Sequence, residues 1–211
     1  MEVFSNSAIS LDGRLGTARY DHLRLGSGED LRRMEALRAE ADAVLVGGRT
    51  WRAWCLPLAS TAASSARPLI NAVLTRCGAG PRTGRFFADP RTRPVILGGP
   101  AADLDGFPAG TVVHRAPVEP TVTWALEVLE RHHGVRRLLV EGGGDLLAQL
   151  LEVGLLHELH VTLCPVLLGG RGAPSLVDGP GLAVAALPRL RLVSEERVGD
   201  ELFLRYRVCG S

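Results

Sequence analysis

Residues 138–151 read LLVEGGGDLLAQLL, which is an apolar run, a glycine-rich turn and a second apolar run. The first run predicts a buried strand at residues 137–140, and the spacing of the second predicts a helix at residues 145–153 that ends at Gly154. Between the two runs stand Glu141, three glycines and Asp145. Glycines at such a junction let a ligand approach the backbone, and the first amides of a helix attract anions. The stretch therefore predicts a ligand-binding turn in an α/β fold.

Apolar runs on either side extend this pattern. Strands are predicted at residues 3–9, 43–46, 69–75, 94–97 and 111–113, and helices are predicted after a capping box that starts at Ser27 and at residues 123–133. Beyond Gly154 the pattern changes to strands at residues 158–168, 190–197 and 202–208, the last two forming a hairpin. We expect one domain over residues 1–211, with a mostly parallel central sheet flanked by helices and an antiparallel C-terminal hairpin.

The composition excludes several classes of protein. Hydrophobic residues make up 46% of the 211 residues, and 24 basic and 23 acidic residues, spread along the chain, give a net charge of +1. We therefore expect no nucleic-acid partner. Every residue in the basic count is arginine, which excludes a lysine Schiff base and the lysine-containing P-loop. The four cysteines form no CxxC pair, and no segment resembles an export signal or membrane span, so we expect a cytoplasmic protein without a membrane partner.

Glycines follow three of the predicted strands, at Gly47-Gly48, Gly98-Gly99 and Gly142–Gly144. Because the carboxyl ends of parallel strands form the ligand crevice of an open sheet, these turns predict a nucleotide or another phosphorylated ligand. The alternative is that each is only a tight turn between a strand and a helix. Arg49-Thr50 fits the 2′-phosphate that distinguishes NADP from NAD, or is simply an exposed arginine beside a helix cap.

The remaining candidates favour structural roles. His157 and His160 are three apart in a strand-like context, which does not match the spacing of a zinc motif, so we expect no metal. His132-His133 would interact with the dipole at a helix C-terminus. Trp51 and Trp54 either line a pocket or pack in the core.

Four ordered motifs carry a resemblance to a known family. They are SLDGR at residues 10–14, LRAEADAVLVG at residues 37–47, VEGG at residues 140–143 with LLEVGLLHEL at residues 150–159, and PVLLGG at residues 165–170. Together they resemble the reductase domain of the bacterial riboflavin-biosynthesis deaminase-reductase, over about residues 3–208. The resemblance implies a dihydrofolate-reductase-like fold, to which the GRTW segment at residues 48–51 is also similar.

The activity implied by the resemblance is an NADPH-dependent reduction. Hydride would pass to the ribose carbon of 5-amino-6-(5-phosphoribosylamino)uracil or a related phosphorylated pyrimidine or pterin, in a homodimer. Arg38, Leu58 and Glu141 would contact the substrate, with Glu141 as the catalytic candidate. The resemblance and the glycine turns together assign NADPH contacts to Ala8, Gly48, Arg49, Thr50, Thr75, Gly142, Gly143, Gly144, Asp145, Leu146, Leu147 and Gln149. Asp145 would point away from phosphate and cap the helix.

Two other functions fit the same residues. Dihydrofolate or other pterin reduction would need a carboxylate on the first helix, for which Glu29, Asp30 and Glu35 are available. A non-catalytic NADP-binding protein of the same fold is the other alternative, because Trp54 and Cys55 stand where the family usually has an acidic pair.

Overall fold

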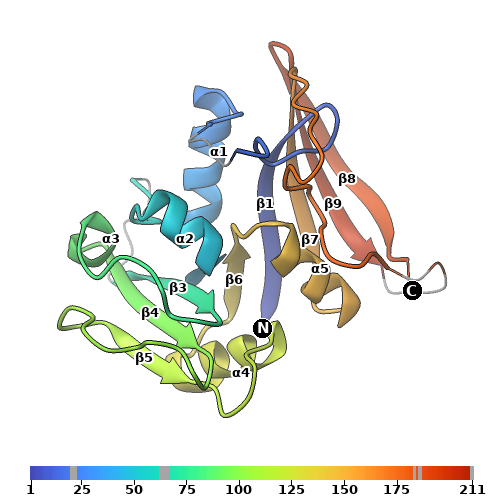
Figure 1. Ribbon diagram of the computed structural model, residues 1–211. Coiled ribbons are helices and arrows are strands. Elements are labelled where there is room, and N and C mark those ends of the chain that lie inside the picture. The colour runs from blue at the N-terminus through green and yellow to red at the C-terminus, as the bar shows by residue number, and fades with distance from the viewer. Residues whose placement is uncertain (20–22, 62–66, 183, 185–186, 210–211) are drawn as a thin grey trace. The chain divides into compact units, whose positions relative to one another are not determined.

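The computed structural model describes residues 1–19, 23–61, 67–182, 184 and 187–209. Its helices are α1 (Gly28–Ala39), α2 (Gly48–Trp54), α3 (Arg85–Ala88), α4 (Val122–His133) and α5 (Gly144–Glu152) (Figure 1). Its strands are β1 (Glu2–Ser10), β2 (Ala43–Gly47), β3 (Leu69–Thr75), β4 (Thr92–Gly98), β5 (Val112–Arg115), β6 (Arg137–Val140), β7 (Glu158–Cys164), β8 (Arg189–Val198) and β9 (Glu201–Cys209). Within this described part, no helix combines the length and apolar character needed to cross a bilayer.

The chain divides into two compact units. The first unit comprises Met1 and Glu35–Leu139, and the second comprises Glu2–Met34 and Val140–Ser211. The expectation of one domain over residues 1–211 remains a prediction.

Parallel strands form the core of the first unit. They lie in the order β5-β4-β3-β2-β6, and the pairs β2–β3, β3–β4 and β4–β5 are parallel. Every residue of β3 is buried, as expected for a central strand covered on both faces. An aromatic cluster packs beside these strands, where Trp51 of α2 meets Phe86, Phe87 and Phe107 with ring centroids 6.2–6.4 Å away.

The second unit combines one parallel strand pair with the antiparallel hairpin. Its strands lie in the order β1-β7-β9-β8, with β1 parallel to β7 and with β9 antiparallel to both β7 and β8. Gly199, whose φ is +61°, forms the turn between β8 and β9. The predicted α/β fold with a mostly parallel sheet and a C-terminal hairpin is confirmed.

Several boundaries differ from those expected. The strand predicted at residues 158–168 ends at Cys164, because the next residue, Pro165, has no N–H to continue the ladder. The helices α2 and α3 were not predicted, since both are too short to show a clear periodicity. In the loop predicted at residues 59–66, residues 59–61 are in neither a helix nor a strand, and residues 62–66 lie outside the described residues.

Candidate functional site

Two of the sequence motifs meet in the second unit through Asp12. The Asp12 carboxylate accepts hydrogen bonds from the Ser10 hydroxyl (2.6 Å) and from the backbone N–H groups of Leu168 (3.0 Å) and Gly169 (2.7 Å). These bonds favour the charged form and lower the pKa of Asp12 to about 2. The Asp12 carboxylate therefore holds the PVLLGG loop at the end of β1. Both motifs thus have a structural role.

The glycine turn at the start of α5 leaves that helix without a side-chain cap. Its N-cap is Gly143, which has no side-chain oxygen to accept a hydrogen bond from the N–H groups of the first turn. The prediction that Asp145 caps the helix is wrong. Helical geometry begins at Gly144, so the exposed Asp145 lies inside the first turn and is beyond the capping position. By contrast, α4 is capped in the ordinary way, with Thr121 Oγ1 accepting from the N–H of Trp124 (3.2 Å).

The three glycines of this turn have different surroundings. A Cβ on Gly144 would lie 2.4 Å from the carbonyl oxygen of Ser175 and 2.7 Å from the backbone nitrogen of Asp178. A Cβ on Gly142 would meet the Leu146 side chain at 2.3 Å, whereas a Cβ on Gly143 would meet nothing within 4 Å. Close approach of the chain to itself therefore explains Gly144, while the space at Gly143 is open to a ligand.

Replacing Gly144 with alanine is expected to destabilise the protein by about 1–3 kcal/mol, because the new methyl group overlaps backbone atoms that have to move. Gly143→Ala is the matched control, since its Cβ meets only open space. Thermal unfolding of both variants measures the difference. Equal melting temperatures would contradict the packing of the residue 175–178 loop against Gly144.

In the first unit, α2 begins directly after β2 and also lacks a side-chain cap. Its N-cap is Gly47, and a Cβ on Gly48 would lie 2.9 Å from Thr75 Oγ1, so β3 and the start of α2 touch at this glycine. Thr75 is buried, and its hydroxyl accepts a hydrogen bond from the N–H of Gly78 (3.2 Å). Arg49 is exposed and Thr50 half-buried at this end of the helix.

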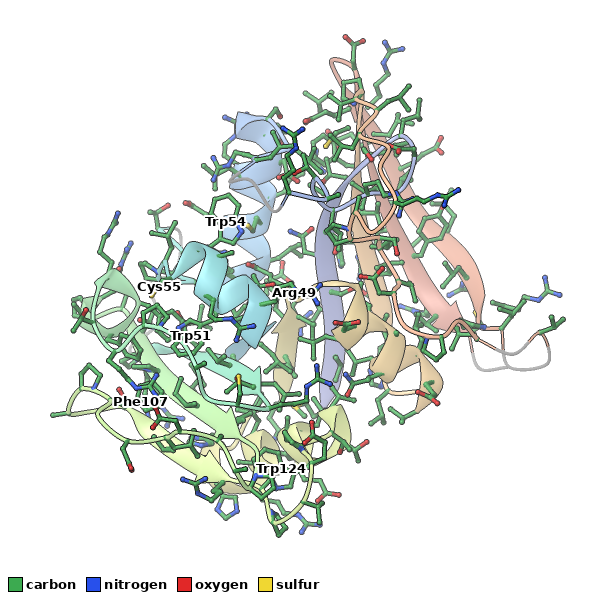
Figure 2. All side chains as sticks on the ribbon, viewed as in Figure 1. Arg49, Trp51, Trp54, Cys55, Phe107 and Trp124 are labelled. Carbon is green, nitrogen blue, oxygen red and sulfur yellow. The ribbon has the colours of Figure 1, made fainter. Side chains whose placement is uncertain are left out.

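The two tryptophans of α2 have different roles. Trp51 was expected either to line a pocket or to pack in the core. It is buried in the aromatic cluster and therefore packs in the core. Trp54 is 43% exposed, and it is followed by Cys55, whose φ of +41° ends the helix in the left-handed region (Figure 2).

The predicted substrate contacts Arg38 and Leu58 belong to one hydrogen-bonded arrangement in the first unit. Arg38 is only 9% exposed, and its Nη1 donates to the carbonyl of Ala59 (3.1 Å). Leu58 is held by the fully buried Asn71, whose Oδ1 accepts from the Leu58 N–H (2.8 Å) and whose Nδ2 donates to the Leu58 carbonyl (3.1 Å). Arg38 and Asn71 thus fix the backbone after α2. The only sequence signal for Asn71 is a lone amide in an otherwise apolar strand.

A group of carboxylates gathers in the second unit. Asp30 of α1 receives a hydrogen bond from the side chain of Thr162, a β7 residue that pairs with Ala8 of β1. Burial, followed by the negative charges of Glu201 and Glu141, raises the pKa of the Asp30 carboxyl. Its buried Oδ1 has no hydrogen-bond partner among the described residues. Of the predicted site residues, Glu141 therefore acts on Asp30 through its charge.

The capping box predicted at Ser27 is only partly formed. Ser27 Oγ accepts from the N–H of Glu29 (3.1 Å), as an N-cap residue does. In a complete box Asp30 would accept from the Ser27 N–H, but Glu201 Oε1 does so instead (2.8 Å), and the Ser27 hydroxyl donates to Glu201 Oε2 (2.6 Å). The buried Glu201, at the start of β9, thus takes the place of Asp30. No local pattern could have shown a partner 174 residues away.

The histidine at the end of α4 does more than face the helix dipole. His133 Nε2 lies 2.9 Å from Nε2 of His114 on β5, so the two imidazoles share a hydrogen bond. Burial and the neighbouring His114 lower the pKa of His133 to about 4. The prediction that His132-His133 act only on the helix dipole is therefore wrong for His133.

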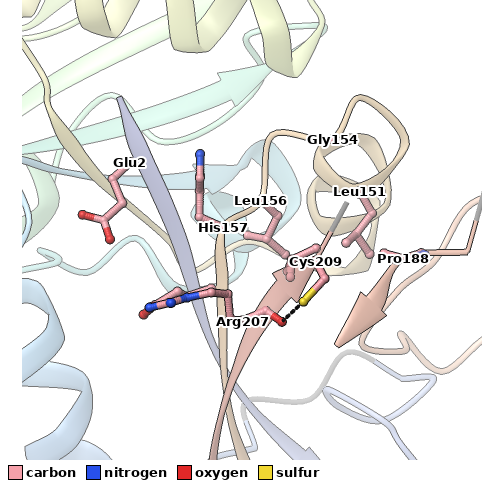
Figure 3. A pocket seen from close by; sticks show the side chains of 10 residues that line it. Glu2, Leu151, Gly154, Leu156, His157, Pro188, Arg207 and Cys209 are labelled. Carbon is pink, nitrogen blue, oxygen red and sulfur yellow. Dashed lines mark hydrogen bonds and ion pairs between the residues drawn. The ribbon is translucent and has the colours of Figure 1, made fainter. Parts of the chain in front are cut away.

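One cavity of the second unit lies apart from the predicted site. It has a volume of about 380 Å³ and is lined by Glu2, Leu151, Gly154, Leu156, His157, Glu158, Pro188, Arg207, Val208 and Cys209 (Figure 3). None of the residues predicted to bind substrate or cofactor is among them. The histidine His157 is engaged within the unit, because its Nδ1 accepts from the N–H of Val3 (3.1 Å).

Residues 1–204 match the RibD C-terminal domain family. The chain belongs to this family. It is 33% identical over 214 residues to the 2,5-diamino-6-ribosylamino-4(3H)-pyrimidinone 5′-phosphate reductase of Methanothermobacter thermautotrophicus, and the alignment covers 99% of this chain and 98% of the relative. The reductase of the same name from Archaeoglobus fulgidus is also 33% identical, over 211 residues that cover 94% of each chain.

Solved structures agree with the fold. The RibD structure from Acinetobacter baumannii aligns with a TM-score of 0.80 at 20% identity, covering 99% of this chain and 58% of that one. The expected dihydrofolate-reductase-like fold is confirmed. The expected resemblance to the reductase domain of the bacterial protein is confirmed at the level of the family, and the chain also aligns along almost the whole length of the two archaeal reductases.

Proposed function

We propose that the protein is an NADPH-dependent reductase acting on 2,5-diamino-6-ribosylamino-4(3H)-pyrimidinone 5′-phosphate or a closely related phosphoribosylamino-pyrimidine. The observation that carries this proposal is the 33% identity to archaeal reductases of that name over 94–99% of the chain. The product would be the ribityl compound, in which the ribose ring is open.

The helix ends described above support a phosphorylated nicotinamide cofactor. Both α2 and α5 begin at a glycine after a strand and have no side-chain cap, and helix N-termini of this kind attract phosphate oxygens. In the first unit Gly48, Arg49, Thr50 and Thr75 are the proposed contacts, with the Arg49 guanidinium suited to the 2′-phosphate. In the second unit the proposed contacts are Ala8, Gly142, Gly143, Gly144, Asp145, Leu146, Leu147 and Gln149. NADPH would supply the hydride and leave as NADP⁺.

The side chains of the protein would orient the substrate and stabilise its charge. The Glu141 carboxylate is suited to sugar hydroxyls, which are hydrogen-bond donors. Arg38 and Leu58 are proposed to contact the substrate. Because the Arg38 side chain binds Ala59, we expect it to act partly by holding the backbone around Leu58 in place.

Two further features concern the oligomeric state of the protein and its cellular compartment. All ten residues of the edge strand β8 are exposed, including the apolar side chains of Leu190, Leu192 and Val193, and we propose that a second copy of the chain covers this strand in a homodimer. Sedimentation equilibrium tests the dimer.

All four cysteines are free thiols, namely Cys55, Cys77, Cys164 and Cys209. Free thiols favour a reducing compartment, and we propose the cytoplasm.

Oxidation of NADPH, followed by absorbance, tests the function with the phosphoribosylamino-pyrimidine and with dihydrofolate as alternative substrates. We expect turnover with the pyrimidine, and a loss of about 100-fold in kcat/KM for Glu141→Ala, because the sugar loses its hydrogen-bond acceptor. Turnover with dihydrofolate alone would favour pterin reduction, and NADPH binding without turnover of either compound would favour a non-catalytic protein. Preference for NADH would contradict the role of Arg49.

A further inference from the structure

A buried segment without regular structure follows α2. Residues 55–60 are in neither a helix nor a strand, yet Ala59 and Ser60 are buried. Irregular segments usually run over the surface, because buried backbone N–H and C=O groups need the partners that a helix or a sheet would otherwise supply. The 58–61 segment, which includes the proposed substrate contact Leu58, therefore has to be held by side chains of the first unit.

Asn71 of β3 holds the first residue of this segment. It is fully buried, in a strand whose other residues apart from Thr75 are apolar. Its Oδ1 accepts a hydrogen bond from the Leu58 N–H (2.8 Å), and its Nδ2 donates to the Leu58 carbonyl (3.1 Å). A primary amide carries a donor and an acceptor, as a peptide group does. Asn71 therefore pairs with Leu58 as a neighbouring strand would.

Two side chains of α1 hold the residues that follow. The buried Arg38 donates from its Nη1 to the Ala59 carbonyl (3.1 Å), and Glu35 accepts a hydrogen bond from the Thr61 hydroxyl. Arg38 and Glu35 are three residues apart and so lie on one face of the helix. The 58–61 segment is thus bonded at three of its positions to side chains of a neighbouring helix and strand, and its conformation is set before a ligand binds.

These bonds restrict how Leu58 could contact a substrate. Its N–H and its carbonyl are both bonded to Asn71, which leaves mainly the apolar side chain for a ligand. That side chain is half-buried and packs against the core cluster that contains Trp51. An apolar group held in this way is suited to the flat ring of a pyrimidine, because a preformed site loses less conformational freedom on binding.

We infer that Asn71 is a positioning residue for the substrate, because its amide fixes the Leu58 backbone and so sets the place at which the Leu58 side chain meets the pyrimidine ring. Glu35 supports the same geometry, since its bond to Thr61 holds the other end of the 58–61 segment. The inference rests on the proposed function for the identity of the ligand. The bonds between Asn71 and Leu58 are a property of the protein without substrate.

Asn71→Leu tests the inference, because leucine fills a similar space and removes both hydrogen bonds to Leu58. We expect the KM for the phosphoribosylamino-pyrimidine to rise by about ten-fold or more, with kcat and the Kd for NADPH each within about two-fold of the wild type, since Leu58 would contact the ring and not the reacting carbon. The matched control is Thr92→Val, which removes the hydrogen bond from a buried hydroxyl of the adjacent strand β4 to the Asp89 carbonyl (3.2 Å). It should leave all three constants unchanged.

Asn71→Asp separates positioning from a general loss of packing. A protonated carboxyl group can donate and accept, as the amide does, whereas the ionised carboxylate can only accept. The KM of this variant relative to that of the wild type should therefore be small at about pH 5.5 and should rise towards about pH 8. Hydrogen exchange of the Leu58 amide follows the contact directly, and it should be faster in Asn71→Leu than in the wild type.

The possible outcomes are distinct. A folded Asn71→Leu with the wild-type KM for the pyrimidine would overturn the inference, and so would an equal rise in this KM and in the Kd for NADPH. If Asn71→Leu does not fold, Asn71→Asp decides, because a relative KM that stays constant with pH also overturns the inference. If the wild type turns over neither the pyrimidine nor dihydrofolate, the proposed function fails, while faster exchange of the Leu58 amide in Asn71→Leu still supports the role of Asn71 in fixing this backbone.

Discussion

Asp30→Asn is expected to be at least as stable as the wild type at pH 7, although it replaces a carboxyl group that is partly buried. Asparagine keeps the shape of the side chain and can accept the hydrogen bond from Thr162. Its neutral amide removes the cost of an ionised carboxylate placed near Glu141 and Glu201.

The sign of this stability effect depends on pH. Because the pKa of Asp30 is raised in the folded state, the folded protein holds the proton more tightly than the unfolded chain. Folding stability is therefore lost as pH rises from the ordinary aspartate value of about 3.9 towards the folded value. Asp30→Asn should remove this loss, so denaturant unfolding at pH 4 and pH 7 should show a smaller difference for the variant than for the wild type.

Glu29→Gln is the control for this experiment. Glu29 lies in the same turn of α1 but is paired with Arg32 and Arg33 at the surface. We expect its free energy of unfolding at pH 7 to stay close to that of the wild type, because exposed ion pairs of this kind contribute little. An Asp30→Asn variant whose stability changed between pH 4 and pH 7 as much as that of the wild type would contradict the raised pKa of Asp30.

The parts of the fold that could be predicted are those set by local pattern. The strand at β3 was predicted with its observed ends, because six apolar or β-branched residues, interrupted only by Asn71, lie between clear breaks. The glycine turn before α5 was recognised as a strand-to-helix junction for the same reason. Its N-cap was misplaced, since the start of a helix depends on where the backbone turns rather than on which polar residue is near.

The parts of the site that could not be predicted depend on distant contacts. Glu201 meets Ser27 and Asn71 meets Leu58 only when the fold brings them together. Asp30 was one of three carboxylates on the first helix that the sequence could not tell apart. Helical spacing alone does not say which carboxylate faces β7, whereas the contact of Asp30 with Thr162 does. Buried polar groups of this kind need a partner, and the partner is set by tertiary structure.

The stability of the first unit should depend strongly on Trp51. Its side chain is 2% exposed, and it contacts three phenylalanine rings as well as the backbone at Gly80, where a Cβ would lie 2.0 Å from the indole. The indole Nε1 is buried without a hydrogen-bond partner among the described residues, so the ring contributes through packing rather than through a polar bond. The GRTW motif therefore has a core residue as its last member, directly after the residues proposed to contact phosphate.

Trp51→Ala is expected to destabilise the protein by about 3–5 kcal/mol, because the lost ring leaves a cavity among rigid aromatic neighbours. This corresponds to a fall of about 10 °C in the melting temperature for a chain of this size. Trp54→Ala, on the same helix but 43% exposed, should change stability by no more than about 0.5 kcal/mol. Trp51→Phe should lie between the two, since it keeps an aromatic ring and removes the unpartnered N–H. Calorimetric unfolding of the three variants measures these differences, and a Trp51→Ala variant as stable as Trp54→Ala would contradict the buried position of the indole.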